Sequence, residues 1–335
     1  MDNKNKEAQS ARANSLHDID FVDVFISETG KVFFRGADGG EKLVENASEL
    51  LMHDLGILHQ KACSMGQNEN EFFLDFNSMR FRASRLDSVD ETWYVLRRAI
   101  WPVPRLAQLD GIHNKVIEYL GMLGRPGKSG LILISGASAN GKTTTACSLL
   151  QEYLVWYGDI AVTLEDPVEL PMNGPHGGRG YCFQIPVRDG NFALALKRSM
   201  RHSPRYILLG EIRSSDVASH VIRASINGHI VISTIHAGGV IDTINALLKS
   251  VVGSEPVEMA RAVLADGLLG IVNQRLLSVQ TRGVLRRHIR AEYFFPGDDK
   301  GLRSLIRNGK PEQLATAIEM QMRRVEQGLL PVESG

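Results

Sequence analysis

Short runs in which apolar and polar residues alternate dominate the first hundred residues. Such period-two patterns, bounded by glycine and asparagine, predict half-buried β-strands. One segment differs, because leucines recur every three or four positions between residues 47 and 65, and this spacing predicts a helix. Short strands around one helix predict a small α+β domain. The expected strands cover residues 21–26, 31–35, 71–74, 78–83 and 92–96.

After residue 105, continuous apolar runs alternate with segments of helical periodicity. Strands separated by helices predict an α/β domain with a mainly parallel sheet, which binds its ligand at the carboxyl ends of the strands. From residue 240 to residue 322 helical signals dominate. The expected strands are 131–135, 160–164, 206–209 and 229–234, and the expected helices are 106–123, 144–156, 191–201 and 214–226.

Two prolines separate these two patterns. Pro102 and Pro104 fix their own φ and bias the preceding residues towards extended backbone, so the segment is expected to be a stiff joint. The predicted organisation is a mobile tail (1–18), an N-terminal domain (19–101), a linker (102–105) and a C-terminal domain (106–335).

A glycine-rich segment lies between the expected strand at 131–135 and the expected helix at 144–156. It fits the phosphate-loop pattern G-x-x-x-x-G-K-[ST]. Glycines let the backbone curl around an anion, lysine adds a positive charge, and the hydroxyl completes a Mg²⁺ shell. The segment therefore predicts binding of ATP with Mg²⁺. The expected binding residues are Gly136, Ala137, Ser138, Ala139, Asn140, Gly141, Lys142, Thr143 and Thr144.

Two more apolar strands end in acids. Glu211 follows the strand at 206–209, where it would polarise the water that attacks the γ-phosphate. Glu165 follows the strand at 160–164 and would hold Mg²⁺ through water or orient the nucleophile. Thr143, Glu165 and Glu211 are thus the expected metal-associated residues. The alternative for each acid is a solvated residue in a turn.

Two histidines, His229 and His236, bracket the expected strand at 229–234 and should lie near its opposite ends. Together with Thr234 they suit a sensor of the γ-phosphate. Metal binding is less favoured, because no third ligand is suitably spaced. The alternative is a histidine whose hydrogen bonds are satisfied within the fold.

Arginines recur in the N-terminal strands. Arg80 and Arg82 alternate along one strand and would share a face, and Arg97 follows in the next. One interpretation is a solvated strand face. The other is that these residues are arginine fingers, which reach the triphosphate of an adjacent subunit through bidentate guanidinium geometry.

The amino-acid composition limits the class of protein, its partners and its compartment. The 335 residues are 43% hydrophobic and 23% charged, which is typical of globular proteins with a sizeable core. Basic and acidic residues number 38 each, and this balance argues against bulk nucleic-acid binding. Three scattered cysteines predict neither disulfides nor zinc, so a reducing cytoplasm is expected. Neither a signal peptide nor a membrane span is expected, so any membrane role must come through a partner.

The order of four motifs resembles the type II/type IV secretion ATPase superfamily. In that family the motifs are named Walker A, Asp box, atypical Walker B and His box. Here they read GASANGKT at 136–143, LEDPVE at 164–169, LGEIR at 209–213 and GHIVISTIH at 228–236. The branch resembled most is that of the pilus retraction ATPases (PilT-like), to which IVNQRLL at 271–277 and LIRNGK at 305–310 are also similar.

This resemblance implies a RecA-like C-terminal domain, a PAS-like N-terminal domain and a homohexameric ring. ATP would lie between the domains of the same or a neighbouring chain. Hydrolysis would move the domains about the proline joint and act, from the cytoplasmic side, on an inner-membrane platform protein. By motif match, Lys142 and Thr143 bind phosphate and Mg²⁺, Glu211 is the general base, Glu165 supports metal or water, and His229 senses the nucleotide.

The chain also departs from the family. Gln184 is followed by isoleucine rather than by the expected arginine, which leaves open which arginines act across subunits. Arg188, Arg198 and Arg201 are further candidates. A glycine-rich insert at 173–180 and a short C-terminal segment are equally compatible with a motor of a conjugation or type IVB secretion apparatus. A nucleic-acid translocase of RecA-like fold is a distant alternative.

Overall fold

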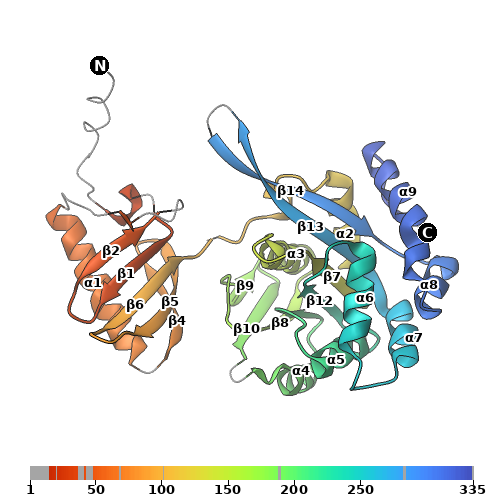
Figure 1. Cartoon of the computed structure of the whole chain (residues 1–335), viewed down its shortest axis with the longest axis horizontal. Coiled ribbons are helices and arrows are strands. Elements are labelled where there is room, and N and C mark those ends of the chain that lie inside the picture. Colours follow the sequence, from red (N-terminus) through yellow and green to blue (C-terminus); the bar gives the residue numbers. More distant parts are fainter. Residues whose placement is uncertain are drawn as a thin grey trace. The chain divides into compact units, whose positions relative to one another are not determined.

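The computed structural model describes residues 15–19, 21–36, 41–42, 48–67, 69–100, 102–187, 190–281 and 284–333. For residues 41–42, 278–281 and 284–286 it describes the backbone alone. The chain divides into two compact units, residues 1–101 and 102–335 (Figure 1). No helix within the described ranges combines the length and the apolar content needed to cross a membrane.

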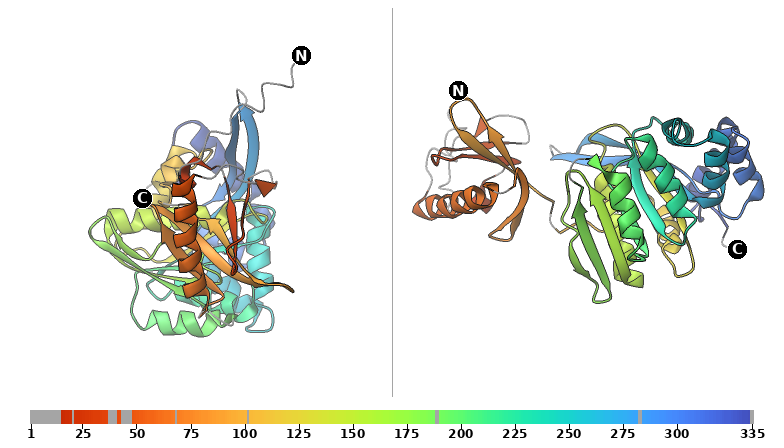
Figure 2. Two further views of the ribbon diagram at one scale, coloured as in Figure 1. Left: turned by 90° about the vertical axis from the view of Figure 1, so that its left-hand side faces the viewer. Right: turned by 90° about the horizontal axis from the view of Figure 1, so that it is seen from below.

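The first unit is an antiparallel sheet with α1 along one face (Figure 2). Its strand order is β3-β2-β1-β6-β5-β4. Val24, Leu96 and Phe81 are buried in one core with three of the four leucines of α1, while their neighbours along each strand point to the other face. The elements are η1 (Leu16–Asp18), β1 (Asp23–Ser27), β2 (Val32–Arg35), β3 (Glu41–Lys42), α1 (Glu49–Gly66), β4 (Glu71–Phe76), β5 (Met79–Asp87) and β6 (Thr92–Arg98).

Residues 15–18, which the sequence placed in the mobile tail, belong to this unit. Leu16 is fully buried in its core. The Ser15 backbone N–H donates to the Asp18 carboxylate at 2.9 Å, and His17 Nε2 bonds the Asn77 carbonyl at 2.7 Å. One leucine among polar residues carries no periodic signal, so this anchoring could not be read from the sequence. Residues 1–14 lie outside the described part of the chain.

The second unit has a sheet ordered β14-β13-β7-β12-β11-β8-β10-β9 among its described strands. The six from β13 to β10 are mutually parallel, and both edge strands are antiparallel to their neighbours. The strands are β7 (Gly130–Ser135), β8 (Asp159–Glu165), β9 (Gly174–His176), β10 (Gly180–Pro186), β11 (Tyr206–Leu209), β12 (Ile230–Ile235), β13 (Leu268–Thr281) and β14 (Val284–Phe294).

Helices cover both faces of this sheet (Figure 2). One core joins α2 and α3 to the sheet, and the other joins α4, α5, α6 and α7 to its opposite face. Because both faces are covered, every residue of β7, β11 and β12 is buried, which explains their continuous apolar runs. The helical elements are η2 (Leu106–Gln108), α2 (Asn114–Leu123), α3 (Lys142–Tyr157), α4 (Phe192–Met200), α5 (Ser215–Ser225), α6 (Val240–Ser250), α7 (Val257–Gly267), α8 (Lys300–Arg307), η4 (Pro311–Leu314) and α9 (Ala315–Glu326).

The expectation of a largely helical region from 240 to 322 is wrong in its centre. There β13 (Leu268–Thr281) and β14 (Val284–Phe294) form a long antiparallel pair (Figure 1). β13 pairs in parallel with buried β7, with Ile271 opposite Leu133. A short apolar run has no period that separates a strand from a buried helix, so the pairing with β7 decides the outcome.

The glycine-rich segment at 173–180 has regular structure, since β9 and β10 pair there around a turn in which Gly177 and Gly178 have φ of 57° and 78°. The expected helix at 106–123 is interrupted, because η2 ends at Gln108 and α2 begins only at Asn114.

The proline segment is held against the second unit. Val103 is 3% exposed and lies in the core with α2 and α3. Arg105 donates from Nε and Nη2 to the Glu152 carboxylate, each at 2.7 Å. Val103 and Arg105 of the predicted linker are therefore anchored to the second unit.

Candidate functional site

The loop at 136–141 connects the end of β7 to the first residue of α3. Gly136, Ala139 and Gly141 have φ of 149°, 61° and 76°, values that glycine adopts readily and alanine does not. At Gly136 a Cβ would lie 2.3 Å from the Gln274 carbonyl oxygen, so this position also needs glycine for space. Ala137 and Ser138 are exposed, and Thr143 and Thr144 lie in the first turn of α3. The helix dipole therefore favours an anion at this loop.

Strand β13 holds the loop in place. The Asn140 side-chain Oδ1 accepts from the Leu276 backbone N–H at 3.0 Å, and the Gln274 side-chain Nε2 donates to the Asn140 carbonyl at 2.7 Å. Asn273 Nδ2 donates to Ser135 Oγ at 3.0 Å and to the Ala237 carbonyl at 3.1 Å. These supporting residues were not predicted as site residues, although the stretch 271–277 carried part of the family resemblance.

Lys142 Nζ lies inside the curve of the loop. It donates to the Ala137 carbonyl at 2.9 Å and lies 3.5 Å from His236 Nδ1. Burial lowers the pKa of Lys142, while the charges of Glu211 and Glu169 act in the opposite direction. The ammonium group is thus partly desolvated and close to two carboxylates, which suits exchange of its present partners for a phosphate.

Glu211 follows β11 and meets residues from two other segments. Its Oε1 is 2.8 Å from His236 Nε2, and its Oε2 accepts from Arg213 Nε at 2.9 Å and pairs with Arg213 Nη2 at 2.8 Å. Both carboxylate oxygens are therefore oriented by neighbouring donors. Lys142, Glu211 and His236 form one cluster at the carboxyl ends of β7, β11 and β12.

The role predicted for His229 is wrong. β12 runs parallel to β7, with Ile230 opposite Gly130 and Ile235 opposite Ser135. His229 precedes β12 and therefore lies at the amino edge of the sheet, away from the phosphate loop. Its Nδ1 bonds the Pro204 carbonyl at 2.6 Å. His236, which the sequence placed at the other end of this strand, is the histidine of the cluster.

Glu165 ends β8 and is 1% exposed. Its Oε1 accepts from Gln184 Nε2 at 2.8 Å, and the Glu169 backbone N–H points to Oε2 at 3.4 Å. Burial raises the pKa of Glu165, more than these hydrogen bonds lower it. Gln184, the residue after which the family pattern is broken, therefore supports the Asp-box acid.

A cavity of about 650 Å³ opens between the loop and β13, within the size range of small-molecule sites. Side chains of β13 form one wall, and the loop at 136–141 and the segment after β12 form the others. The lining residues are Gly136, Ala137, Ser138, Asn140, His236, Ala237, Gly238, Asn273, Arg275, Leu276 and Leu277.

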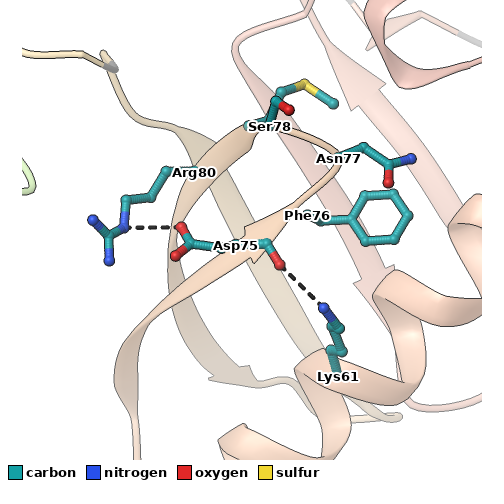
Figure 3. Close-up of a pocket in the computed structure, with 7 residues that line it drawn as sticks. Lys61, Asp75, Phe76, Asn77, Ser78 and Arg80 are labelled. Carbon is teal, nitrogen blue, oxygen red and sulfur yellow. Dashed lines mark hydrogen bonds and ion pairs between the residues drawn. The ribbon is translucent and has the colours of Figure 1, made fainter.

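The predicted arginine fingers lie in the first unit, and each is close to a carboxylate. Arg80 Nε is 2.9 Å from Asp75, beside a 320 Å³ pocket that Lys61 also lines (Figure 3). Arg82 lies 4.0 Å from Glu71, and Arg97 Nε lies 2.8 Å from Asp23. Arg188, another candidate, lies outside the described residues.

The donors near the loop fit Mg²⁺ as part of a nucleotide complex. Thr143, Glu165 and Glu211 carry side-chain oxygens, the type of ligand that this ion prefers. In the described part of the chain no three His, Cys, Asp or Glu side chains form a group that could hold a metal. Most of the ligands of a bound Mg²⁺ would therefore be phosphate oxygens and water, as in other phosphate-loop sites.

Comparison with known sequences agrees with this geometry. Residues 67–294 match the family model described as "Type II/IV secretion system protein". Over 151 residues the chain is 34% identical to the type II secretion system protein HxcR of Pseudomonas aeruginosa, which covers 44% of this chain and 29% of HxcR. The chain thus spans less than a third of the length of that relative.

Solved structures resemble most of the chain. The crystal structure of the pilus retraction motor PilT with bound ADP is 27% identical, with a TM-score of 0.73 over 93% of this chain and 91% of PilT. The Legionella pneumophila ATPase DotB shares the fold at 22% identity, with a TM-score of 0.67 over 93% of this chain and 85% of DotB. The predicted fold class, a RecA-like domain with a mainly parallel sheet and a small N-terminal domain, is confirmed.

Proposed function

Since the chain belongs to the type II/IV secretion system protein family, we propose that it is a motor that hydrolyses ATP to drive a pilus or secretion machine. One observation carries the proposal. Lys142, Glu211 and His236 are joined by contacts of 3.5 Å and 2.8 Å at the carboxyl ends of three parallel strands, beside a curled loop at a helix N-terminus. This is where an α/β sheet binds phosphate.

Each residue of the cluster has its own role in ATP hydrolysis. Lys142 exchanges the Ala137 carbonyl for phosphate oxygens and balances their charge. Glu211, oriented by His236 and Arg213, accepts a proton from the water that attacks the γ-phosphate. His236 takes the sensing role first expected of His229, because it contacts both Lys142 and Glu211. Thr143 would hold Mg²⁺ with support from Glu165 and Glu211, and the bound ion would neutralise charge at the phosphates.

The motor works as a homohexameric ring in the cytoplasm, attached to the inner membrane through a platform protein. Similarity to the pilus retraction motor PilT over most of both chains supports this part of the proposal. Arg80, Arg82 and Arg97 act on a nucleotide bound by a neighbouring copy. The break between the two units after residue 101 is where they move relative to each other during the cycle.

A motor of a conjugation or type IVB secretion apparatus is the alternative. The departure from the family pattern after Gln184, where the family arginine is missing, is compatible with this alternative. Co-purification with the products of neighbouring genes distinguishes the two functions. A pilus platform protein as partner supports the pilus motor, whereas a conjugation or type IVB component supports the alternative.

Steady-state ATP turnover and nucleotide affinity of the purified ring, with Mg²⁺ present, test the proposal. Lys142→Ala should abolish nucleotide binding, because the phosphates lose their buried cation. Glu211→Gln should bind ATP but turn over at least about 10²-fold more slowly, because the general base is lost. His236→Asn should lower turnover about tenfold, since Glu211 loses one orienting contact.

His229→Asn is the matched control, because His229 is the same residue type at the opposite end of the same strand; its turnover should stay within about twofold of wild type. Near-normal turnover in Glu211→Gln would remove that residue from the mechanism. A well-formed ring that consumes no ATP would overturn the proposal.

A further inference from the structure

Strand β4 lies at one edge of the first unit's sheet, and no described strand pairs with its outer side (Figure 1). The strand at the other edge, β3, has two residues, whereas β4 has six residues that pair with β5 in unbroken register. Proteins often protect a sheet edge by a short strand, a proline or a bulge, because unpaired backbone groups accept another strand. β4 has none of these three features and is regular enough to accept one more strand.

The backbone groups of every second residue of β4 point to this open edge. Along an antiparallel pair, positions that exchange hydrogen bonds alternate with positions that do not. The Arg85 N–H donates to the Asn70 carbonyl at 2.8 Å, so the even-numbered residues of β4 are the ones that bond to β5. The N–H and C=O groups of Glu71, Phe73 and Asp75 therefore point outward, where an added strand would meet them.

A groove follows this edge between β4 and α1. Lys61 of α1 crosses it, and its Nζ donates to the outward carbonyl of Asp75 at 3.2 Å, the kind of hydrogen bond that a neighbouring strand would supply (Figure 3). Cavities of about 450 Å³ and 320 Å³ share these two residues in their linings. The larger one extends to Met65 of α1, whose side chain is 40% exposed. The groove therefore offers outward backbone groups together with an apolar contact.

Acidic side chains determine which kind of strand fits. Glu71 and Asp75 lie on the face of β4 directed away from α1, and their side chains are 49% and 67% exposed. Half-buried Phe73 lies between them on the same face. On the β5 side the register places Arg82 and Arg80 beside these positions. Opposite charges on neighbouring strands stabilise a sheet, so basic residues suit the corresponding positions of an added strand.

A second copy of β4 does not suit this edge. Antiparallel pairing of two copies about Phe73 would place Glu71 of each copy opposite Asp75 of the other. Like charges directly opposite each other destabilise a sheet. The charge pattern therefore favours a different chain with basic residues in these positions.

We propose that an extended segment of a partner protein binds as an additional strand beside β4, with basic residues opposite Glu71 and Asp75 and an apolar residue opposite Phe73. Strand addition takes its affinity from backbone hydrogen bonds and its specificity from alternate side chains. The intervening residues of the segment face α1, where Met65 provides an apolar contact. All residues of this docking site belong to the first unit, so binding does not require a nucleotide.

Fluorescence anisotropy of the full-length protein with a labelled, capped peptide of sequence TRTVIRT tests the site. Its two arginines lie four positions apart, with valine midway, to match Asp75, Phe73 and Glu71 in antiparallel order. The dissociation constant should lie below about 1 mM. Methylation of the valine nitrogen should weaken binding at least about tenfold, because the hydrogen bond to the outward Phe73 carbonyl is lost. The peptide TETVIET should also bind at least about tenfold more weakly.

Charge reversal on the protein tests the same contacts from the other side. Glu71→Lys/Asp75→Lys should reverse the preference, so that TETVIET binds more tightly than TRTVIRT. Glu49→Lys/Asp90→Lys is the matched control, because it makes the same change of charge on two exposed acids of the first unit that line neither cavity. This control should keep the wild-type preference. Thermal unfolding of each variant checks that it is folded.

Equal affinity for the methylated and unmethylated peptides would overturn the proposal, as would no binding of TRTVIRT up to about 1 mM. These two measurements use the wild-type protein and therefore decide the question even where a variant does not fold. An unchanged preference in folded Glu71→Lys/Asp75→Lys protein would also contradict it. If the wild type self-associates and this variant does not, the edge binds another copy of the chain and the partner segment is wrong.

Discussion

Asp23 in the first unit and Glu165 in the second are both almost fully buried, at 0% and 1% exposure, yet their pKa values shift in opposite directions. Burial raises the pKa of Asp23, but hydrogen bonds and charge from Arg97 and Arg35 outweigh it, and the pKa is lowered. Glu165 accepts from neutral groups, the Gln184 amide and the Glu169 backbone, and its pKa is raised. Burial alone therefore does not set the charge of a carboxyl group; the charge of its donors does.

This contrast matches two different roles. Asp23 stays ionised and holds two arginines in one row of the sheet. Glu165 sits at the end of β8, in the Asp box, with a carboxyl group that gains a proton easily and loses it when a cation approaches. A buried acid that lacks a cationic partner is therefore suited to supporting Mg²⁺.

Asp23→Asn should cause the largest change in the free energy of unfolding. Two half-exposed guanidinium groups lose their shared counter-charge, so the free energy of unfolding of the first unit should fall by about 2 kcal/mol at pH 7. Denaturant unfolding measures this change. Because the pKa of Asp23 lies below its ordinary value of 3.8, this stabilisation is complete above that pH and is lost as the pH falls through the lowered value.

Asp87→Asn is the control, since it removes an exposed partner of Arg85 and should leave the free energy of unfolding close to that of the wild type. Equal stability of the Asp23→Asn variant and the wild type at neutral pH would show that the guanidinium groups do not need Asp23.

Glu165→Gln should change the free energy of unfolding by less, and in the opposite direction. Removing a buried charge without a cationic partner should stabilise the second unit by about 1 kcal/mol at pH 8, while ATP turnover falls. The raised pKa means that wild-type stability decreases as the pH rises from the ordinary value of 4.5 through the raised one. The gain should therefore shrink as the pH is lowered towards 4.5 in denaturant titrations. A destabilised variant at pH 8 would contradict this account of Glu165.

Glu169→Gln should give the smallest change in the free energy of unfolding. The negative charge of Glu169 contributes to the raised pKa of Glu165, so its removal should move the pH dependence of wild-type stability slightly towards acid. The change at pH 8 should be below about 0.5 kcal/mol. Glu319→Gln is the control, because the Glu319 side chain is exposed on α9, and it should leave the pH dependence in place. A shift towards alkaline pH would contradict the assigned electrostatics.

The phosphate loop illustrates what could be predicted locally. Its glycines, lysine and threonine lie within eight consecutive positions, and the flanking strand and helix were predicted from nearby periodicity. The supports of the loop could not be predicted in this way. Asn140 and Gln274 are 134 positions apart and meet only because β13 adds to the sheet next to β7. The same long-range pairing makes residues 268–281 a strand, whereas their apolar run was equally compatible with a helix.

The sequence by itself determined the two-domain α/β organisation, the phosphate loop and the acids that end β8 and β11, because these depend on short-range pattern and backbone chemistry. Tertiary structure alone decided which histidine joins Lys142 and Glu211, since the parallel direction of β12 places His236 at the phosphate edge and His229 at the opposite one. It also decided that Asp23 lies between Arg35 and Arg97, because strand register brings together residues 12 and 74 positions apart. Spacing along the chain does not contain strand direction or register; both follow from the packing of complete sheets.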